Sequence, residues 1–202
     1  ALNKTIEDVT RSYDRFEFHL VTSRLTDQFC INVLSEYYLD VQKDILYCDR
    51  PDSRRRRSAQ TAFLLVTKAL ARLLAPLMSF TAEETWQTLK AQNLLDKGDD
   101  GRSVFLNDFP EPVAMPSAIL DMNDLLGLRR AATGVAEKLR QEGTVKGLND
   151  LGVGLIVPDR VFGKFPPEKL AVWVGVASLT PMDGGSNNGR KAPGDKCQRC
   201  WI

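Results

Sequence analysis

Apolar residues recur three and four positions apart through much of the first ninety residues, which is the period of an amphipathic helix. Pro76 should kink or end the third apolar stripe, because proline lacks an amide donor. Asn32 or Ser35 is a candidate N-cap between the first two stripes. The three stripes are Phe18, Val21, Leu25 and Phe29; Leu34, Tyr38, Val41 and Ile45; and Phe63, Val66, Leu70, Leu73 and Leu77.

A fourth helix should begin at Thr81, because Thr81–Glu84 has the spacing of a capping box. This helix would carry Trp86 and Leu89. Four amphipathic helices can bury their apolar faces against one another. Residues 1–95 are therefore predicted to form a helical bundle, with a loop at Pro51–Ser53.

The pattern changes after the bundle. Residues 96–119 form a polar connector, in which Val104–Leu106 and Phe109 are expected to dock onto the helices. A fifth apolar stripe ends near Gly143 and is followed by two short valine-rich runs typical of strands, 151–157 and 172–179. One helical turn is expected at Pro166–Lys169. Residues 120–182 are thus predicted to form a small α+β subdomain, and residues 183–202 a flexible linker and tail. The fifth stripe consists of Leu125, Leu128, Ala132, Val135 and Leu139.

The composition is that of a soluble globular protein. The chain has 202 residues, 43% of them hydrophobic, and a formal net charge of +1. No apolar stretch is long enough to span a bilayer, and the first ten residues lack the apolar core of a signal peptide, so we expect a cytoplasmic protein without a membrane role. The chain has no initiator Met and ends two residues after Cys200, which suggests a fragment.

The sequence offers no catalytic constellation. His19 is the only histidine and lies within a helical stretch. The glycines between Gly147 and Gly154 follow a helix and lack the Lys-Ser/Thr pair of a phosphate-binding loop. Catalysis by this chain alone is therefore not expected.

Four consecutive arginines, Arg54–Arg57, form a basic block where the loop meets the third helix of the bundle. Because successive helical residues are 100° apart, about two of the four can face one phosphate backbone while the others pair or are solvated. Guanidinium groups suit phosphates and unpaired bases, although a solvated helix start explains the same residues. Lys43 and Gln60 are weaker RNA-binding candidates. Of Tyr37, Tyr38 and Tyr47, at least one should be a core residue rather than a base-stacking one.

Two pairs of cysteines differ in their surroundings. Cys30 and Cys48 lie among apolar or aromatic residues without a partner at metal-ligand spacing, so we expect buried thiols. Cys197 and Cys200 form a Cys-x-x-Cys knuckle that suits one tetrahedral zinc ion. A lone knuckle supplies half of a zinc site and could instead be redox-active, but the preceding Gly/Asn-rich linker does not favour that use. The predicted fold class is therefore mainly α: a helical bundle, a small α+β subdomain and a truncated zinc-knuckle tail.

Several sequence elements occur in the order and spacing of a known family. They include Tyr38-Leu39-Asp40, Lys43-Asp44-x-Leu46-Tyr47, Ala75-Pro76 and Phe80-Thr81-Ala82-Glu83-Glu84-x-Trp86. Together with the terminal Cys-x-Arg-Cys-Trp, this run resembles the anticodon-binding region of bacterial isoleucyl-tRNA synthetases, which are class I aminoacyl-tRNA synthetases. The sequence departs from the family at Ile45, where arginine is usual, and across Lys146–Asp150.

The resemblance implies binding of isoleucine tRNA through an anticodon-binding bundle that acts beside a catalytic domain of the same, monomeric chain. It implies that the parent enzyme joins isoleucine to tRNA with ATP and magnesium, and that its zinc site takes a second cysteine pair from downstream. Since only Cys197 and Cys200 are present here, this chain alone should hold no stoichiometric zinc. The alternatives are a related class I synthetase, valyl or leucyl, and a stand-alone helical interaction module.

Overall fold

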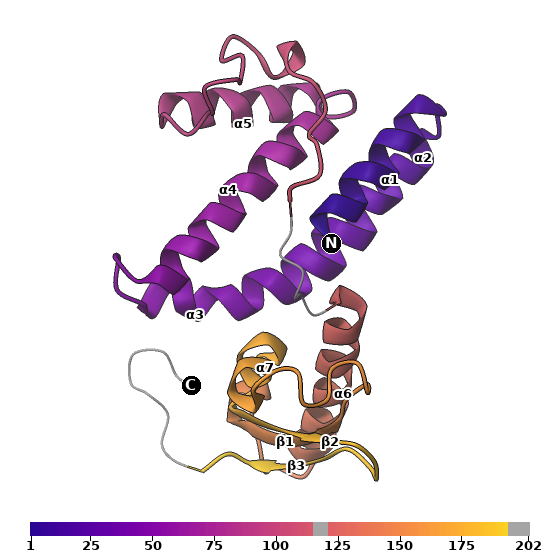
Figure 1. Cartoon of the computed structure of the whole chain (residues 1–202), viewed down its shortest axis with the longest axis vertical. Helices are drawn as coiled ribbons and strands as arrows, with labels where there is room; N and C mark the ends of the chain where they lie inside the picture. Colours follow the sequence, from indigo (N-terminus) through magenta and orange to yellow (C-terminus); the bar gives the residue numbers. More distant parts are fainter. Residues whose placement is uncertain (115–120, 194–202) are drawn as a thin grey trace. The chain divides into compact units, whose positions relative to one another are not determined.

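The computed structural model describes residues 1–114 and 121–193, and these residues divide into two compact units (Figure 1). Unit 1 contains residues 1–38 together with the segment from Asp49 to the first gap. Unit 2 contains the short stretch Leu39–Cys48 and all described residues from 121 onward. The polypeptide therefore enters unit 2, returns to unit 1, and then enters unit 2 a second time.

Unit 1 begins with a helix, α1 (Leu2–Asp14), that precedes the first predicted stripe. Ile6 and Val9 are buried on its inner face, and Leu2 and Tyr13 pack beside them, so the apolar spacing is again helical. These residues pack against Val21, Leu25, Ala69 and Leu73 from three later helical elements. The core of the bundle thus includes a helix, α1, that lies before the first predicted stripe.

The first two predicted stripes lie on one uninterrupted helical run rather than on two capped helices. α2 (Phe18–Ser23), η1 (Arg24–Leu39) and α3 (Asp40–Cys48) follow one another directly, so Asn32 and Ser35 cap nothing. η1 is a π-helix, whose i→i+5 hydrogen bonds suit the five-residue step from Phe29 to Leu34. The predicted break between the two stripes is wrong, because the π-helical hydrogen bonds accommodate the five-residue spacing without ending the helix.

The third predicted helix is α4 (Arg54–Leu74), and it ends just before Pro76 as expected. α5 (Ser79–Ala91) follows, but Thr81 does not cap it. The helix begins at Ser79, after Met78, and the amide of Ala82 already bonds to the Met78 carbonyl. The described residues 1–114 contain no strand, as the bundle prediction requires.

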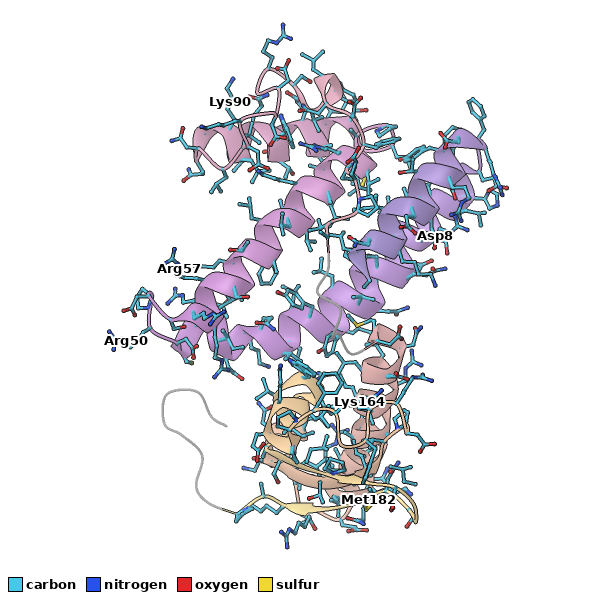
Figure 2. All side chains as sticks on the ribbon, in the orientation of Figure 1. Asp8, Arg50, Arg57, Lys90, Lys164 and Met182 are labelled. Atoms are coloured by element: carbon cyan, nitrogen blue, oxygen red, sulfur yellow. The ribbon has the colours of Figure 1, made fainter. Side chains whose placement is uncertain are left out.

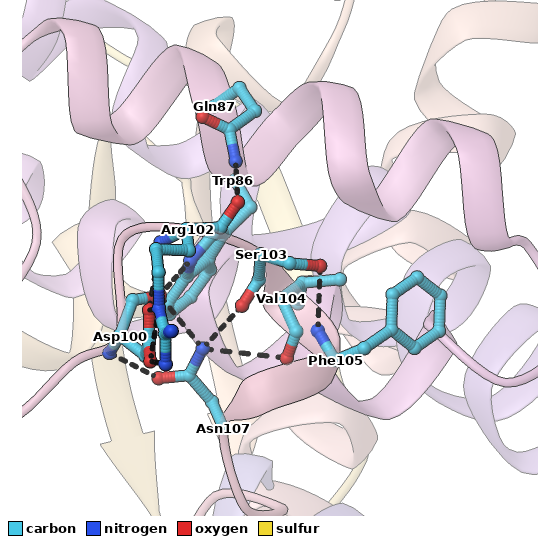
Figure 3. A network of polar contacts seen from close by, with 8 residues as sticks. All are labelled: Trp86, Gln87, Asp100, Arg102, Ser103, Val104, Phe105 and Asn107. Carbon is cyan, nitrogen blue, oxygen red and sulfur yellow. Dashed lines mark hydrogen bonds and ion pairs between the residues drawn. The ribbon is translucent and has the colours of Figure 1, made fainter.

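The segment after α5 folds back onto it and is held by a polar network (Figure 3). The Trp86 indole donates to the Asp100 carbonyl at 2.9 Å, and Asn107 bonds to carbonyls of the same loop. Val104, in the 3-10 turn η2 (Val104–Leu106), is buried against Trp86, whereas Phe105 and Leu106 are exposed. The docking prediction holds for Val104 but is wrong for its two neighbours, because the single turn directs only Val104 inward.

Unit 2 is built around the helix α6 (Met122–Gln141) and a three-stranded sheet. The Asp121 carboxylate caps α6 by accepting from the Asn123 amide at 2.8 Å. The 3-10 turn η3 (Leu148–Asp150) leads into the central strand β1 (Leu151–Ile156), which pairs in parallel with β2 (Ser178–Met182). β1 pairs on its other side, antiparallel, with β3 (Asn188–Lys191). The small α+β architecture predicted for this region is present.

Two boundaries in unit 2 differ from the sequence prediction. The expected single turn after Pro166 is a complete helix, α7 (Pro167–Val174), so the second strand starts at Ser178 rather than Val172. Val174 and Leu170 serve as the buried face of a helix, and Gly175 ends it at a φ of +78°. A short valine-rich run is compatible with either structure, which explains the misassignment.

The predicted flexible linker contains the strand β3, which corrects the expectation for residues 188–191. This strand lacks apolar alternation and is held by backbone pairing to β1. Gly189 lies directly against α6, since a Cβ there would come within 2.6 Å of the Val135 Cγ1 atom. The glycine that suggested a linker therefore permits close packing instead.

Candidate nucleic-acid interface

The loop before α4 is organised around Asp49 and the N-cap residue Ser53. The Ser53 hydroxyl accepts from the Arg56 amide at 3.1 Å and donates to the Asp49 carboxylate at 3.0 Å. The Arg56 guanidinium donates to the Asp49 backbone carbonyl at 3.1 Å. These bonds fix the geometry with which the chain enters α4. Arg56 therefore holds the loop in place.

The other three arginines of the block differ in their partners. The Arg55 Nε atom lies 3.9 Å from the Asp49 carboxylate, a loose and exposed ion pair. Arg54 and Arg57 are exposed, and their guanidinium groups have no partner among the described residues. They are three positions apart on a helix and so share a face, on which Gln60 follows. Figure 2 shows Arg57, and Arg50 from the preceding loop, extending away from the helices.

The electrostatics of the α4 N-terminus favour an anion. Its first turn contains no acidic residue, and its four arginines lie at the positive end of the helix dipole. Cations at this end are unfavourable for the helix, whereas an anion there would be attracted by both the dipole and the side chains. This end of α4 can therefore hold a phosphate group of a nucleic acid.

Lys43 lies on α3 in unit 2 and is already paired. Its ammonium bonds to the Asp40 carboxylate at 2.9 Å, and Arg129 bonds to the same carboxylate. Burial opposes ionisation of Asp40, but the hydrogen bonds from Lys43 and Arg129 outweigh it and lower the pKa. The bond to Asp40 raises the pKa of Lys43. Lys43 thus shares the one negative charge of Asp40 with Arg129.

A hollow of about 280 Å³ lies beside Lys43 and is otherwise lined by Asp40 and residues 146–150. It brings Lys146 close to Lys43, a pairing that we did not predict from the sequence. The two lysines are far apart along the chain and share no local pattern, so only the tertiary structure reveals their proximity.

The three tyrosines have different surroundings. Tyr37 is buried, and the half-buried ring of Tyr38 packs against Phe63 with centroids 5.2 Å apart. Tyr47 is 81% exposed, so it has a ring surface on which a base could stack. The expectation that at least one of the three is a core residue is confirmed by Tyr37.

The described residues contain no group of three side chains suited to hold a metal ion. Cys30 and Cys48 are half-buried and form no disulfide there, and burial raises the pKa of the Cys30 thiol. The predicted zinc ligands Cys197 and Cys200 lie outside the described residues. None of the described helices has the length and apolarity needed to cross a membrane.

A family model for the anticodon-binding domain of tRNA ligases matches residues 1–154 of the chain. The chain belongs to this family. The match covers all of unit 1 and the helix α6, including the arginine-rich start of α4.

The chain also matches several isoleucine–tRNA ligases over almost its whole length. The chain is 34% identical over 203 residues to the isoleucine–tRNA ligase of Dichelobacter nodosus. This match covers 96% of the chain and 21% of the ligase. The ligase of Caldicellulosiruptor saccharolyticus is 32% identical, with 99% and 22% covered. The ligase of Shewanella halifaxensis is 32% identical, with 96% and 22% covered. The chain therefore spans about a fifth of the length of these curated relatives.

Proposed function

We propose that the chain binds the anticodon region of isoleucine tRNA as part of a larger isoleucine–tRNA ligase. In this proposal the rest of the ligase joins isoleucine to the tRNA in the cytoplasm, using ATP and magnesium. The family match and the isoleucine–tRNA ligase relatives support the assignment. Since those relatives are about five times longer, the catalytic activity belongs to polypeptide beyond these 202 residues.

The main support for an RNA contact is that the arginines at the start of α4 differ in their partners. Arg56 is bonded to the loop, whereas Arg54 and Arg57 share a face and their guanidinium groups extend into solvent without a partner in the described chain. Guanidinium groups can bind phosphate oxygens in pairs and can stack on unpaired bases, and an anticodon loop presents both. Lys43 and Arg55, each with an acidic neighbour, and the uncharged Gln60 are secondary contacts in this scheme.

The test is a mobility shift of isoleucine tRNA at two or more salt concentrations with an Arg54→Ala/Arg57→Ala double variant. We expect weaker binding and a shallower plot of log K against log salt, by about 1.4, because each lost phosphate contact on a single strand contributes about 0.7. Arg56 is left intact, since its loss would also disturb the loop.

The matched control is Arg11→Ala/Arg15→Ala, which removes the same charge from the end of α1. Both control residues are exposed, and α1 ends beside the C-terminal end of α4 rather than its arginine-rich start. The control should leave the salt slope unchanged. If both double variants bound the tRNA like the unaltered chain, the arginines would be a solvated helix start and no RNA contact.

Specificity and class are tested in the same assay. A preference for valine or leucine tRNA over isoleucine tRNA would assign the chain to a related class I ligase. A complete absence of any tRNA shift would favour a helical protein-interaction module.

A zinc ion is the second component of the proposal. In the longer ligase, Cys197 and Cys200 would supply two thiolate ligands and a second cysteine pair the others, to complete a tetrahedral structural site. Within residues 1–114 and 121–193, no group of three or more side chains could hold a metal ion by itself.

A further inference from the structure

The start of α4 combines many positive charges with few negative ones. Residues 49–57 contain five arginines and two acids, Asp49 and Asp52, which leaves a local net charge of +3. Such a surface attracts RNA phosphates in general, because the electrostatic part of RNA binding does not depend on base sequence. A domain that selects one RNA therefore benefits from a residue that weakens this general attraction.

The Asp49 carboxylate is bound by the kinds of donor that hold an RNA phosphate. It accepts a hydrogen bond from the Ser53 hydroxyl at 3.0 Å, and its Oδ2 atom lies 3.9 Å from the Arg55 Nε atom. Arginine guanidinium groups and serine hydroxyls are also common donors to phosphate oxygens. The Arg55 side chain is 62% exposed, so a phosphate can approach it from solvent. A phosphate that reaches Arg55 must then compete with Asp49.

The position of Asp49 is fixed by its backbone as well as by its side chain. The Arg56 guanidinium donates to the Asp49 carbonyl at 3.1 Å. The Ser53 amide donates to the Arg50 carbonyl at 3.0 Å, which closes the turn before α4. Because the fold holds Asp49 beside Arg55, their pairing costs none of the translational freedom that a separate RNA molecule loses on binding.

The second acid of this segment, Asp52, has a different partner. Its carboxylate lies 3.2 Å from the Arg50 guanidinium, and the two side chains are 71% and 81% exposed. Arg50 lies in the loop before the arginine block, and an exposed pair of this kind is weak. Asp52 carries the same charge as Asp49 in the same loop, so it provides a matched control.

From these contacts we propose that Asp49 is a specificity-determining residue of the RNA site, because its carboxylate competes with RNA phosphates for Arg55. Specificity can be gained by weakening the binding of wrong partners as well as by improving the contacts with the right one. This role rests on the proposed function, since it requires an RNA that the domain prefers.

Competition by Asp49 discriminates against flexible RNA. An unstructured single strand can place a phosphate against any accessible guanidinium, so it would gain a contact from an unpaired Arg55. A folded anticodon loop presents its phosphates at fixed positions, and in the proposed complex it is bound mainly by Arg54 and Arg57. Asp49 therefore lowers the affinity for unstructured RNA more than the affinity for isoleucine tRNA.

Filter binding of the 202-residue chain to poly(U), an unstructured single-stranded RNA, and to isoleucine tRNA tests this role. Asp49→Asn removes the charge but keeps a carbonyl oxygen that can accept from the Ser53 hydroxyl. The variant should bind poly(U) about fivefold more tightly at low salt, because two unit charges about 4 Å apart in water change an equilibrium constant by roughly that factor.

The salt dependence provides a second readout of the same variant. The plot of log K against log salt for poly(U) should be steeper by about 0.7, the contribution of one additional phosphate contact on a single strand. The affinity for isoleucine tRNA should rise much less, so the preference for this tRNA over poly(U) should fall. A gain for the tRNA as large as that for poly(U) would overturn the proposal, because Asp49 would then confer no specificity.

Two further variants show whether Asp49 acts through Arg55. Asp52→Asn adds the same charge to the same loop and should raise the affinity for poly(U) clearly less. In an Arg55→Ala background, Asp49→Asn should no longer steepen the salt dependence, because the arginine that it releases is absent. Equal gains from the two Asn variants, or a gain that persists without Arg55, would show a general effect of net charge and overturn the proposal.

Thermal unfolding separates these effects from a disturbed loop. The Tm of Asp49→Asn and Asp52→Asn should stay close to that of the unaltered chain, since exposed ion pairs contribute little to stability. A failure of the proposed function has a different signature, which is the absence of any preference of the unaltered chain for isoleucine tRNA over poly(U). In that case the poly(U) measurements would still show whether Asp49 competes for Arg55.

Discussion

Tyr13 makes tertiary contacts through both its ring and its hydroxyl. The hydroxyl supplies a hydrogen bond to the Leu73 carbonyl, one of the carbonyls at the end of α4 that cannot find an amide within the helix. The ring stacks on Phe109 with centroids 5.1 Å apart, so the same residue also anchors the returning connector. Burial raises the pKa of Tyr13 to about 12.

Replacing Tyr13 with phenylalanine should lower the free energy of unfolding by about 1 kcal/mol, because it keeps the ring contacts but leaves the Leu73 carbonyl without its donor. Urea denaturation of the variant and the unaltered chain measures the difference. Tyr47→Phe is the control, since the exposed Tyr47 should contribute little. Equal losses from both variants would contradict the assignment.

The pH dependence of the same variant checks the cause. The folded-state pKa of Tyr13 lies above its ordinary value of 10.0, so its stabilising contribution is complete below pH 10 and is lost as the pH rises through about 12. The unaltered chain should therefore lose more stability than Tyr13→Phe between these values.

At the scale of elements, Glu83 fastens the connector to α5. Its carboxylate accepts from the Val104 amide at 2.9 Å, the Ser103 hydroxyl at 2.8 Å and the Gln87 side chain at 2.8 Å. The bond from the Val104 amide, followed by those from the side chains, lowers the pKa of Glu83 despite the opposing effect of burial. Glu83 thus positions η2 against α5.

Glu83→Gln should remove part of the acid sensitivity of the fold. Because the folded pKa is lowered, the contribution of Glu83 is complete above its ordinary pKa of 4.5 and is lost as the pH falls through the lowered value. The unaltered chain should lose stability more steeply than Glu83→Gln below pH 4.5, measured by thermal unfolding across an acid series. Glu84→Gln, an exposed neighbour, should behave like the unaltered chain; the same flattening in both variants would exclude a special role for Glu83.

Elements with a clear apolar period were predictable, and those defined by tertiary contacts were not. α6 and β1 match their predicted stripe and valine-rich run closely. β3 has no such pattern, because its stability comes from backbone pairing with β1 and from the close approach of Gly189 to α6. For the site, the arginine block was visible in the sequence. The contacts of Arg55 and Arg56 with Asp49 depend on the folded loop and could not be predicted from the sequence.

At the scale of the whole molecule, the sequence predicts that the C-terminal tail contains half of a zinc site. Two thiolates supply only half of the four ligands of a structural zinc site and therefore bind zinc weakly. Elemental analysis should therefore find no stoichiometric zinc in the 202-residue chain, and one zinc in a ligase of the relatives' length. Cys197→Ala should abolish zinc binding in the ligase and Cys30→Ala should not. One tightly held zinc in the short chain would mean that it contains the missing ligands.

The division into two units also has a whole-molecule consequence for engineering. The residues Leu39–Cys48 belong to unit 2 although unit 1 surrounds them in sequence. Asp40 is held there by Arg129, and Val41 lies against Gly175. A chain shortened after the first described range would keep α3 but remove these partners.

During translation, the same arrangement imposes a delay. The ribosome adds about 5–20 residues per second, and Gly175 follows Val41 by roughly 130 residues, so α3 must wait on the order of ten seconds for its partners. Asp40 has no Arg129 beside it for the first 89 residues of that synthesis, and until then the helix is a nascent segment that a chaperone could bind. Synonymous codons that slow elongation between α4 and α6 would lengthen this exposure without altering a single amino acid.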